Sequence, residues 1–194
     1  MCIRDSFLST RLGTCIRFSC KDLRVFSGRA TVGVRGIRLT DKDAVISLAI
    51  LNGINFNVNE RDEYLKISSS LRKNEKINID KDKINEFKSN EEFLLSVTDK
   101  GFGKRSSAYE YRKSNRGGLG IANMQLSQRN GNEIIASFPI KENDQLMLVT
   151  NNGQLIRCPV NDVRIAGRQT QGVTLFKVSE TQRVVSVAKL EEND

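Results

Sequence analysis

The chain has 194 residues, 38% hydrophobic and 28% charged, which suits one globular domain or a little more. It contains no His and no Trp. The absence of His removes the commonest general base, and with it Ser-His or Cys-His catalysis and most metal sites. No apolar run approaches the roughly 18 residues that a membrane-spanning helix needs, so we expect no membrane contact.

The formal net charge is +8, and it is unevenly distributed. Residues 52–92 carry a net charge of −1 and residues 191–194 carry −3, so the remainder carries +12. This imbalance fits a polyanionic partner such as nucleic acid, and it fits a soluble basic surface without a partner equally well. The four cysteines form no C-x-x-C pair, which indicates free thiols in a reducing compartment.

In chain order, residues 1–6 lack the apolar core of a signal peptide, and we assign them no role. A repeat follows, over residues 7–51, 92–141 and 142–190. Each copy has a turn glycine with an Arg four residues later, then a second Arg with a Gly four residues after it. The first pairs are Gly13–Arg17, Gly101–Arg105 and Gly153–Arg157, and the second are Arg29–Gly33, Arg116–Gly120 and Arg168–Gly172.

Each copy also reads as four short strands, for example FLLSVT, FGKRSS, LGIANMQL and EIIASFPI within residues 92–141. Tandem four-stranded units indicate a propeller-like array, in which each sheet buries its faces against its neighbours. We therefore predict an all-β fold of three four-stranded blades, with residues 191–194 as a short acidic tail.

Residues 52–91 interrupt the strand pattern and predict a short helical insert. Asn59 is a candidate N-cap of one amphipathic helix. Asp80 would cap a second helix that turns Ile84 and Phe87 inward. The near-neutral charge favours a variable insertion between blades over a primary contact with a polyanion, and a partner-docking helix is the alternative.

The glycine-rich stretch KSNRGGLGIANMQL, residues 113–126, raises the question of a nucleotide site. A dinucleotide fingerprint needs a third glycine where this chain has Asn123, and the P-loop template also fails. Because Gly120 recurs as Gly33 and Gly172, we expect it to meet a backbone need such as positive φ.

The segments SGRATVGVRGIRLTDKDAVISLAI, LLSVTDKGFGKRSSAYEYRKSNRGGLGI and LMLVTNNGQLIRCPVNDVRIAGRQTQGVTLFKV resemble the C-terminal domain of the DNA gyrase A protein. The resemblance runs from about Phe7 to Glu192. The corresponding protein of topoisomerase IV is the nearest rival. The family's hallmark sequence motif is present here only in a degenerate form, NRGGLG at residues 115–120.

The resemblance implies a β-pinwheel, with strands exchanged between neighbouring blades, whose basic rim wraps double-stranded DNA. It implies that the catalytic tyrosine, ATP and Mg²⁺ act elsewhere in the holoenzyme, so this chain needs no cofactor. The partners implied are the rest of a gyrase A dimer and the gyrase B protein, in an A2B2 heterotetramer in the bacterial cytoplasm, associated with the nucleoid.

DNA wrapping requires many phosphate contacts and little reading of bases. The candidate DNA-binding residues are Arg29, Arg35, Arg38, Lys104, Arg105, Arg112, Lys113, Arg116, Arg157, Arg164 and Arg168. For each one singly, a solvated or ion-paired side chain is the alternative, and Arg17, Arg105 and Arg157 could pair with Asp22, Glu110 and Asp162. A protein-interaction propeller is the competing class, which the low aromatic content disfavours. A self-contained enzyme is disfavoured by the missing His.

Overall fold

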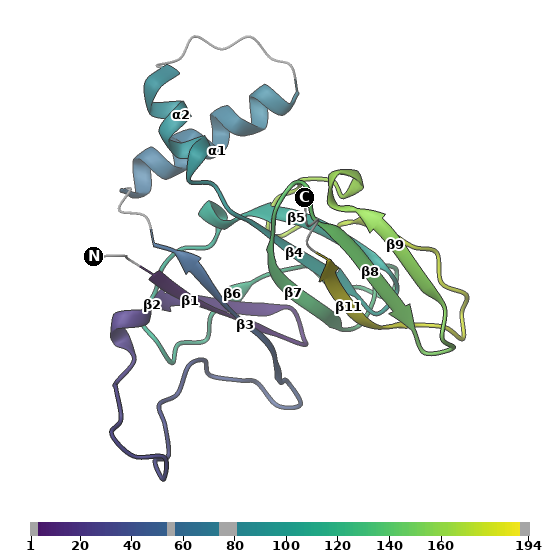
Figure 1. Ribbon diagram of the computed structural model, residues 1–194, viewed down its shortest axis with the longest axis horizontal. Helices are drawn as coiled ribbons and strands as arrows, with labels where there is room; N and C mark the ends of the chain where they lie inside the picture. Colours follow the sequence, from purple (N-terminus) through teal and green to yellow (C-terminus); the bar gives the residue numbers. More distant parts are fainter. Residues whose placement is uncertain (1–3, 54–56, 74–80, 191–194) are drawn as a thin grey trace.

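The computed structural model describes residues 4–53, 57–73 and 81–190. Its strands form three antiparallel sheets that lie side by side, and two helices project from one end of the array (Figure 1). The fold therefore confirms the predicted all-β array of blades, with a helical insert between the first and second blades.

The sheets exchange strands. The first has the order β3-β1-β2-β6, the second β10-β5-β4-β7, and the third β11-β8-β9. The first contains β1 (Arg4–Thr10), β2 (Thr14–Ser19), β3 (Val45–Asn52) and β6 (Ile121–Ala122). The second contains β4 (Phe93–Thr98), β5 (Phe102–Ser107), β7 (Ile134–Ile140) and β10 (Val173–Thr174), and the third contains β8 (Gln145–Thr150), β9 (Leu155–Pro159) and β11 (Val184–Leu190). Thus β6 and β10 each complete the blade of the preceding repeat.

The first repeat begins earlier than predicted. Strand β1 starts at Arg4, within the stretch to which the sequence assigned no role. The side chain of Asp5 is buried, and Asp5 pairs across the sheet with Ser19. A buried carboxylate needs a charged or hydrogen-bonding partner, which Arg17 supplies.

One turn recurs between the first two strands of every repeat. Its glycine has a positive φ between 73° and 90°, which a residue with a Cβ adopts only at a cost. The hydroxyl of the Thr three residues earlier accepts the N–H of the residue after the glycine, at 3.1 to 3.3 Å. The residues involved are Thr10 and Gly13, Thr98 and Gly101, and Thr150 and Gly153.

The hydrophobic core lies between blades. Phe7, Leu51, Leu94 and Tyr111 pack between the first and second sheets, where the Phe7 and Tyr111 rings meet edge to face at 5.1 Å. A second cluster, around Leu95, Leu146, Leu148, Val160 and Val184, fills the space between the second and third sheets. Burial of each such side chain contributes about 1.5–3 kcal/mol, so each blade is stabilised mainly by its neighbour.

The insert forms the two predicted helices, α1 (Val58–Arg72) and α2 (Lys81–Ser89). The predicted N-cap of α1, Asn59, is wrong: the cap is Asn57, whose side chain accepts the Glu60 N–H at 2.9 Å. Glu60 accepts the Asn57 N–H in return at 3.2 Å, which completes a capping box that Asn59 would not form. The proposed cap of α2, Asp80, lies outside the described residues.

Three aromatic rings attach the insert to the second blade. Tyr64 of α1 stacks on Phe87 of α2 with centroids 4.9 Å apart, and Tyr109 meets both rings edge to face. The Tyr109 hydroxyl donates to the Phe87 carbonyl at 2.9 Å. Phe87 and Ile84 face inward as predicted. The insert projects from the array (Figure 1), but this cluster fixes its base to a blade.

Candidate nucleic-acid interface

Three arms carry most of the candidate DNA-binding residues. Each arm follows a short 3-10 turn that ends the second strand of a repeat: η1 (Cys20–Asp22), η2 (Ala108–Glu110) and η3 (Val160–Asp162). We define the first arm as residues 23–37, the second as residues 111–124 and the third as residues 163–176. The repeated glycine lies near the end of each arm.

The second and third arms follow the preceding blade in the same way. Lys113 forms a parallel bridge with Arg17, and Ile165 forms the equivalent bridge with Arg105. Each arm then ends as the exchanged strand, β6 beside β2 and β10 beside β5. Backbone hydrogen bonds at both ends therefore hold the side chains between them in defined positions.

Arg116 and Arg168 occupy equivalent positions and make the same contact. Nη1 of Arg116 donates to the carbonyl of Arg35 at 2.6 Å, and Nη1 of Arg168 donates to the carbonyl of Ala122. Arg35 and Ala122 are themselves equivalent, two residues after the repeated glycine. Each half-buried guanidinium thus ties one arm to the arm before it and retains some surface for a phosphate.

Seven of the candidate residues are exposed, six arginines and one lysine. Among the described residues, only Lys113 of this group forms an ion pair, with its Nζ 3.8 Å from Asp5 Oδ1. Exposed cations without a local carboxylate are available to a polyanion. The seven are Arg29, Arg35, Arg38, Arg112, Lys113, Arg157 and Arg164.

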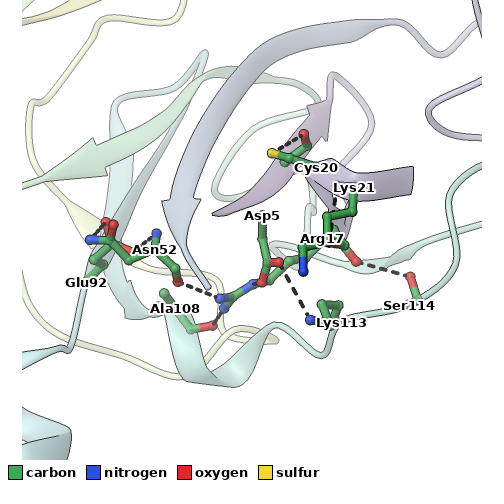
Figure 2. A network of polar contacts seen from close by, with 11 residues as sticks. Asp5, Arg17, Cys20, Lys21, Asn52, Glu92, Ala108, Lys113 and Ser114 are labelled. Atoms are coloured by element: carbon green, nitrogen blue, oxygen red, sulfur yellow. Dashed lines mark hydrogen bonds and ion pairs between the residues drawn. The ribbon is translucent and has the colours of Figure 1, made fainter. Parts of the chain in front are cut away.

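Arg17, which follows the turn glycine of the first repeat by four residues, has a structural role in the first blade (Figure 2). Arg17 is 7% exposed, and its Nε donates to Asp5 Oδ2 at 2.9 Å. The other guanidinium nitrogens donate to the carbonyls of Ala108, at 2.8 Å, and Asn52, at 3.1 Å. The predicted pairing with Asp22 is wrong. Arg17 instead joins its own sheet to the second blade.

Arg105 and Lys104, both candidate DNA-binding residues, also face the interior. Arg105 is 7% exposed and donates through Nε to the Val163 carbonyl at 2.6 Å, so the predicted pairing with Glu110 is wrong. Lys104 is fully buried, and its Nζ donates to the carbonyls of Gly167, at 2.9 Å, and Arg168. Burial lowers the pKa of Lys104 to about 8. Because both side chains are buried, neither is accessible to a phosphate from solvent, and we leave both out of the interface.

Arg157 is the third arginine that follows a turn glycine by four residues. Unlike its equivalents Arg17 and Arg105, it is exposed. The predicted ion pair with Asp162 is not formed in the described part of the chain. Among the described residues, strand β9 has no exchanged strand beside it, unlike β2 and β5, and Arg157 lacks the carbonyl contacts that Arg17 makes.

One exposed arginine was missed by the sequence analysis. Arg24 follows Asp22 by two residues, just as Arg112 follows Glu110 and Arg164 follows Asp162. Its guanidinium carbon lies 5.4 Å from the centre of the Phe26 ring. The repeat spacing could have identified Arg24, because the one extra residue of the first repeat falls after Arg24 and leaves the spacing up to it unchanged.

The described residues contain no group of His, Cys, Asp and Glu side chains suited to hold a metal ion. None of the described helices is long and apolar enough to cross a membrane. The arrangement as a whole offers a series of exposed guanidinium groups on three arms, two of them anchored through their backbone at both ends. Such groups suit recognition of phosphates rather than bond-making chemistry.

The repeats match a known family. A sequence profile described as "DNA gyrase C-terminal domain, beta-propeller" matches residues 7–52, 92–141 and 144–191, which are the three blades without the helical insert. The chain belongs to the DNA gyrase C-terminal domain family.

Two relatives show how much of a longer protein this gyrase domain represents. The A subunit of DNA gyrase from Rickettsia prowazekii is 44% identical over 196 residues, covering 95% of this chain and 22% of its own length. Its counterpart from Granulibacter bethesdensis is 44% identical over 214 residues, covering 98% of this chain and 23% of its own. The chain therefore spans less than a quarter of these proteins.

Solved structures share the fold of this gyrase family member. The C-terminal domain of DNA topoisomerase IV matches with a TM-score of 0.72 at 20% identity, covering 97% of this chain and 47% of that one. A DNA gyrase A C-terminal domain matches with a TM-score of 0.52 at 18% identity, covering 98% of this chain and 67% of that one. At these identities the likeness concerns the fold alone.

Proposed function

We propose that this chain is the DNA-wrapping module of a gyrase A protein. The observation that carries the proposal is the series of equivalent exposed arginines, Arg24, Arg112 and Arg164, one on each arm. Basic side chains at equivalent positions on successive blades form a charged track that is longer than any single blade. A DNA duplex carries phosphates at regular intervals and can contact such a track along its length. The contacts are to backbone phosphate, so the binding has little sequence preference.

The relatives and the family profile support gyrase. The 44% identity is to proteins named as the A subunit of DNA gyrase, and the matching profile is that of the DNA gyrase C-terminal domain. In this proposal the chain acts within a bacterial A2B2 holoenzyme on the cytoplasmic nucleoid. Strand cleavage and ATP hydrolysis occur in other parts of that enzyme. The chain bends the DNA segment that is used for negative supercoiling. The free energy of binding offsets the several kcal/mol that bending the DNA costs.

Duplex binding as a function of salt tests the proposal. A triple variant, Arg24→Gln, Arg112→Gln and Arg164→Gln, removes three phosphate contacts and should lower the slope of log K against log salt by about 3. The matched control, Arg61→Gln, Lys88→Gln and Lys141→Gln, removes the same charge away from the arms and should leave the slope nearly unchanged.

Wrapping itself is tested in the full-length gyrase A protein together with gyrase B, by supercoiling of relaxed plasmid. The arm variant should lose supercoiling while DNA cleavage persists. An arm variant that binds DNA with an unchanged salt slope, or a chain that binds no DNA at low salt, would overturn the proposal and favour a protein-interaction propeller.

A further inference from the structure

A groove of about 720 Å³ lies between helix α1 and the third arm. The α1 side includes Lys66, Ser69 and Arg72, and the arm side includes Arg164 and Gly167. The groove thus joins the insert, which the family profile does not match, to an arm position that we place in the DNA interface.

The groove carries an excess of positive charge. Lys66, Arg72 and Arg164 line it with exposed side chains, and none of the three forms an ion pair among the described residues. The acidic side chain that lines it, Glu110, accepts the Arg168 backbone N–H at 2.5 Å through Oε2. The lining therefore carries three cations against one carboxylate, an excess of two positive charges.

A buried cation, Arg105, lies next to the groove, because its backbone N–H donates to the carbonyl of the lining residue Arg164 at 3.0 Å. Burial is the main reason that the pKa of Arg105 is lowered; Glu142 raises this pKa, and the nearby positive charge of Arg72 lowers it further. The carboxylate of Glu142 lies 3.9 Å from Arg105 but is 75% exposed, so water screens it. The Arg105 guanidinium donates to the carbonyls of Val163 and Asn161, so its positive charge is held in a fixed position near Arg72.

The wall formed by α1 is held in place. Tyr64 lies on α1 two residues before Lys66 and is 4% exposed within the aromatic cluster with Phe87 and Tyr109. The Tyr64 hydroxyl also donates to Glu91 Oε2 at 2.7 Å. Lys66 and Arg72 consequently project from a fixed helix, which limits the entropy that their binding to a ligand would cost.

We propose that this groove binds the phosphodiester backbone of the duplex that follows the arms, so that the helical insert is part of the DNA track. The proposal rests on the proposed function. Guanidinium and ammonium groups supply charge, and the hydroxyl of Ser69 supplies a further hydrogen-bond donor to a phosphate oxygen. The near-neutral total charge of the insert conceals this role, because the groove lining includes Lys66 and Arg72 of the insert and none of its acidic residues.

The test compares two double variants of the whole chain by fluorescence anisotropy with a duplex of about three helical turns. Lys66→Gln with Arg72→Gln should lower the salt slope by about 2 and weaken binding roughly ten- to fiftyfold at 0.1 M salt. Arg61→Gln with Lys88→Gln removes the same charge from the insert outside this groove and should change binding less than threefold. Circular dichroism and the thermal midpoint of each variant establish that it is folded.

Three outcomes would overturn the inference. The first is an unchanged slope for the groove variant while the wild-type chain binds DNA, which would leave the proposed function intact. The second is equal weakening by both double variants, which would indicate a net-charge effect. The third is stabilisation of the wild type, but not the groove variant, by millimolar inorganic phosphate without a difference in DNA binding, which would assign the groove to a small free anion.

Discussion

The first arm and the second arm have the same sequence pattern but different structures. Both carry an Arg followed four residues later by a Gly with φ of +75° or +77°. The second arm ends in strand β6 against β2, whereas residues 26–43 form no strand in the structure. Val25 and Val32 of the first arm are exposed. The third strand of each repeat therefore depends on the sheet edge of another blade, because a short strand gains its hydrogen bonds only from a partner.

Substitution of the repeated glycine should give the largest difference in stability between the two arms. A Cβ on Gly120 would overlap the Cys15 carbonyl oxygen, whereas a Cβ on Gly33 meets nothing within 4 Å. Gly120→Ala should therefore lower the free energy of unfolding by about 3–4 kcal/mol, and Gly33→Ala by about 1 kcal/mol from backbone strain alone. Urea unfolding measures both. Equal losses would show that positive φ, and not strand docking, explains the glycine.

The second and third arms are docked by different chemistry at one equivalent position, Asn123 and Leu175. The Asn123 amide donates to the hydroxyls of Ser9, Ser96 and Ser137 at 3.0–3.2 Å and accepts from the Tyr111 hydroxyl at 2.8 Å. Leu175 instead packs on the apolar cluster between the second and third blades.

Asn123→Leu leaves these buried hydroxyls without their shared partner. Unfolding in urea should show a loss of about 2–4 kcal/mol, because each buried polar group loses a hydrogen bond. The control at the equivalent position, Leu175→Met, conserves apolar volume and should cost below about 1.5 kcal/mol. A loss below about 1 kcal/mol for Asn123→Leu would indicate that the network is dispensable for docking the second arm.

The third arm is also held by Lys104, where the first blade has Ile16. The folded-state pKa of Lys104, about 8, lies below its ordinary value of 10.5, so folding disfavours its protonated form. Stability should therefore rise as the pH increases through this window, by about 2 kcal/mol between pH 7 and pH 9.5 for this group. Urea unfolding of the wild type and Lys104→Met at both values isolates the effect. Parallel pH profiles for the two proteins would contradict it.

Much of the fold could be predicted from the sequence because the repeat aligns turn glycines and strands directly. The sequence also placed Phe87 inside the insert. It could not locate the partners of Arg17 and Arg105, because both reach carbonyl groups that only the packing of blades brings close. Asp5 was overlooked for a related reason: its burial depends on Arg17 and not on a local apolar pattern. Arg112 is exposed and Lys104 is buried, although both were candidate DNA-binding residues. Sequence spacing alone does not show which side chains are exposed.

Anchored and free arginines on the arms should differ only slightly in their contribution to stability. Arg116 donates to the carbonyls of Arg35, at 2.6 Å, and Asp22, at 3.3 Å, whereas its equivalent Arg29 makes no hydrogen bond or ion pair among the described residues. Arg116→Gln should cost about 1 kcal/mol of stability, and Arg29→Gln less than about 0.5 kcal/mol. Thermal unfolding at fixed pH measures both. If Arg29→Gln destabilises the chain as much as Arg116→Gln, the first arm must be held by its guanidinium as the second is, and the contrast between a docked and an undocked arm would fail at this residue.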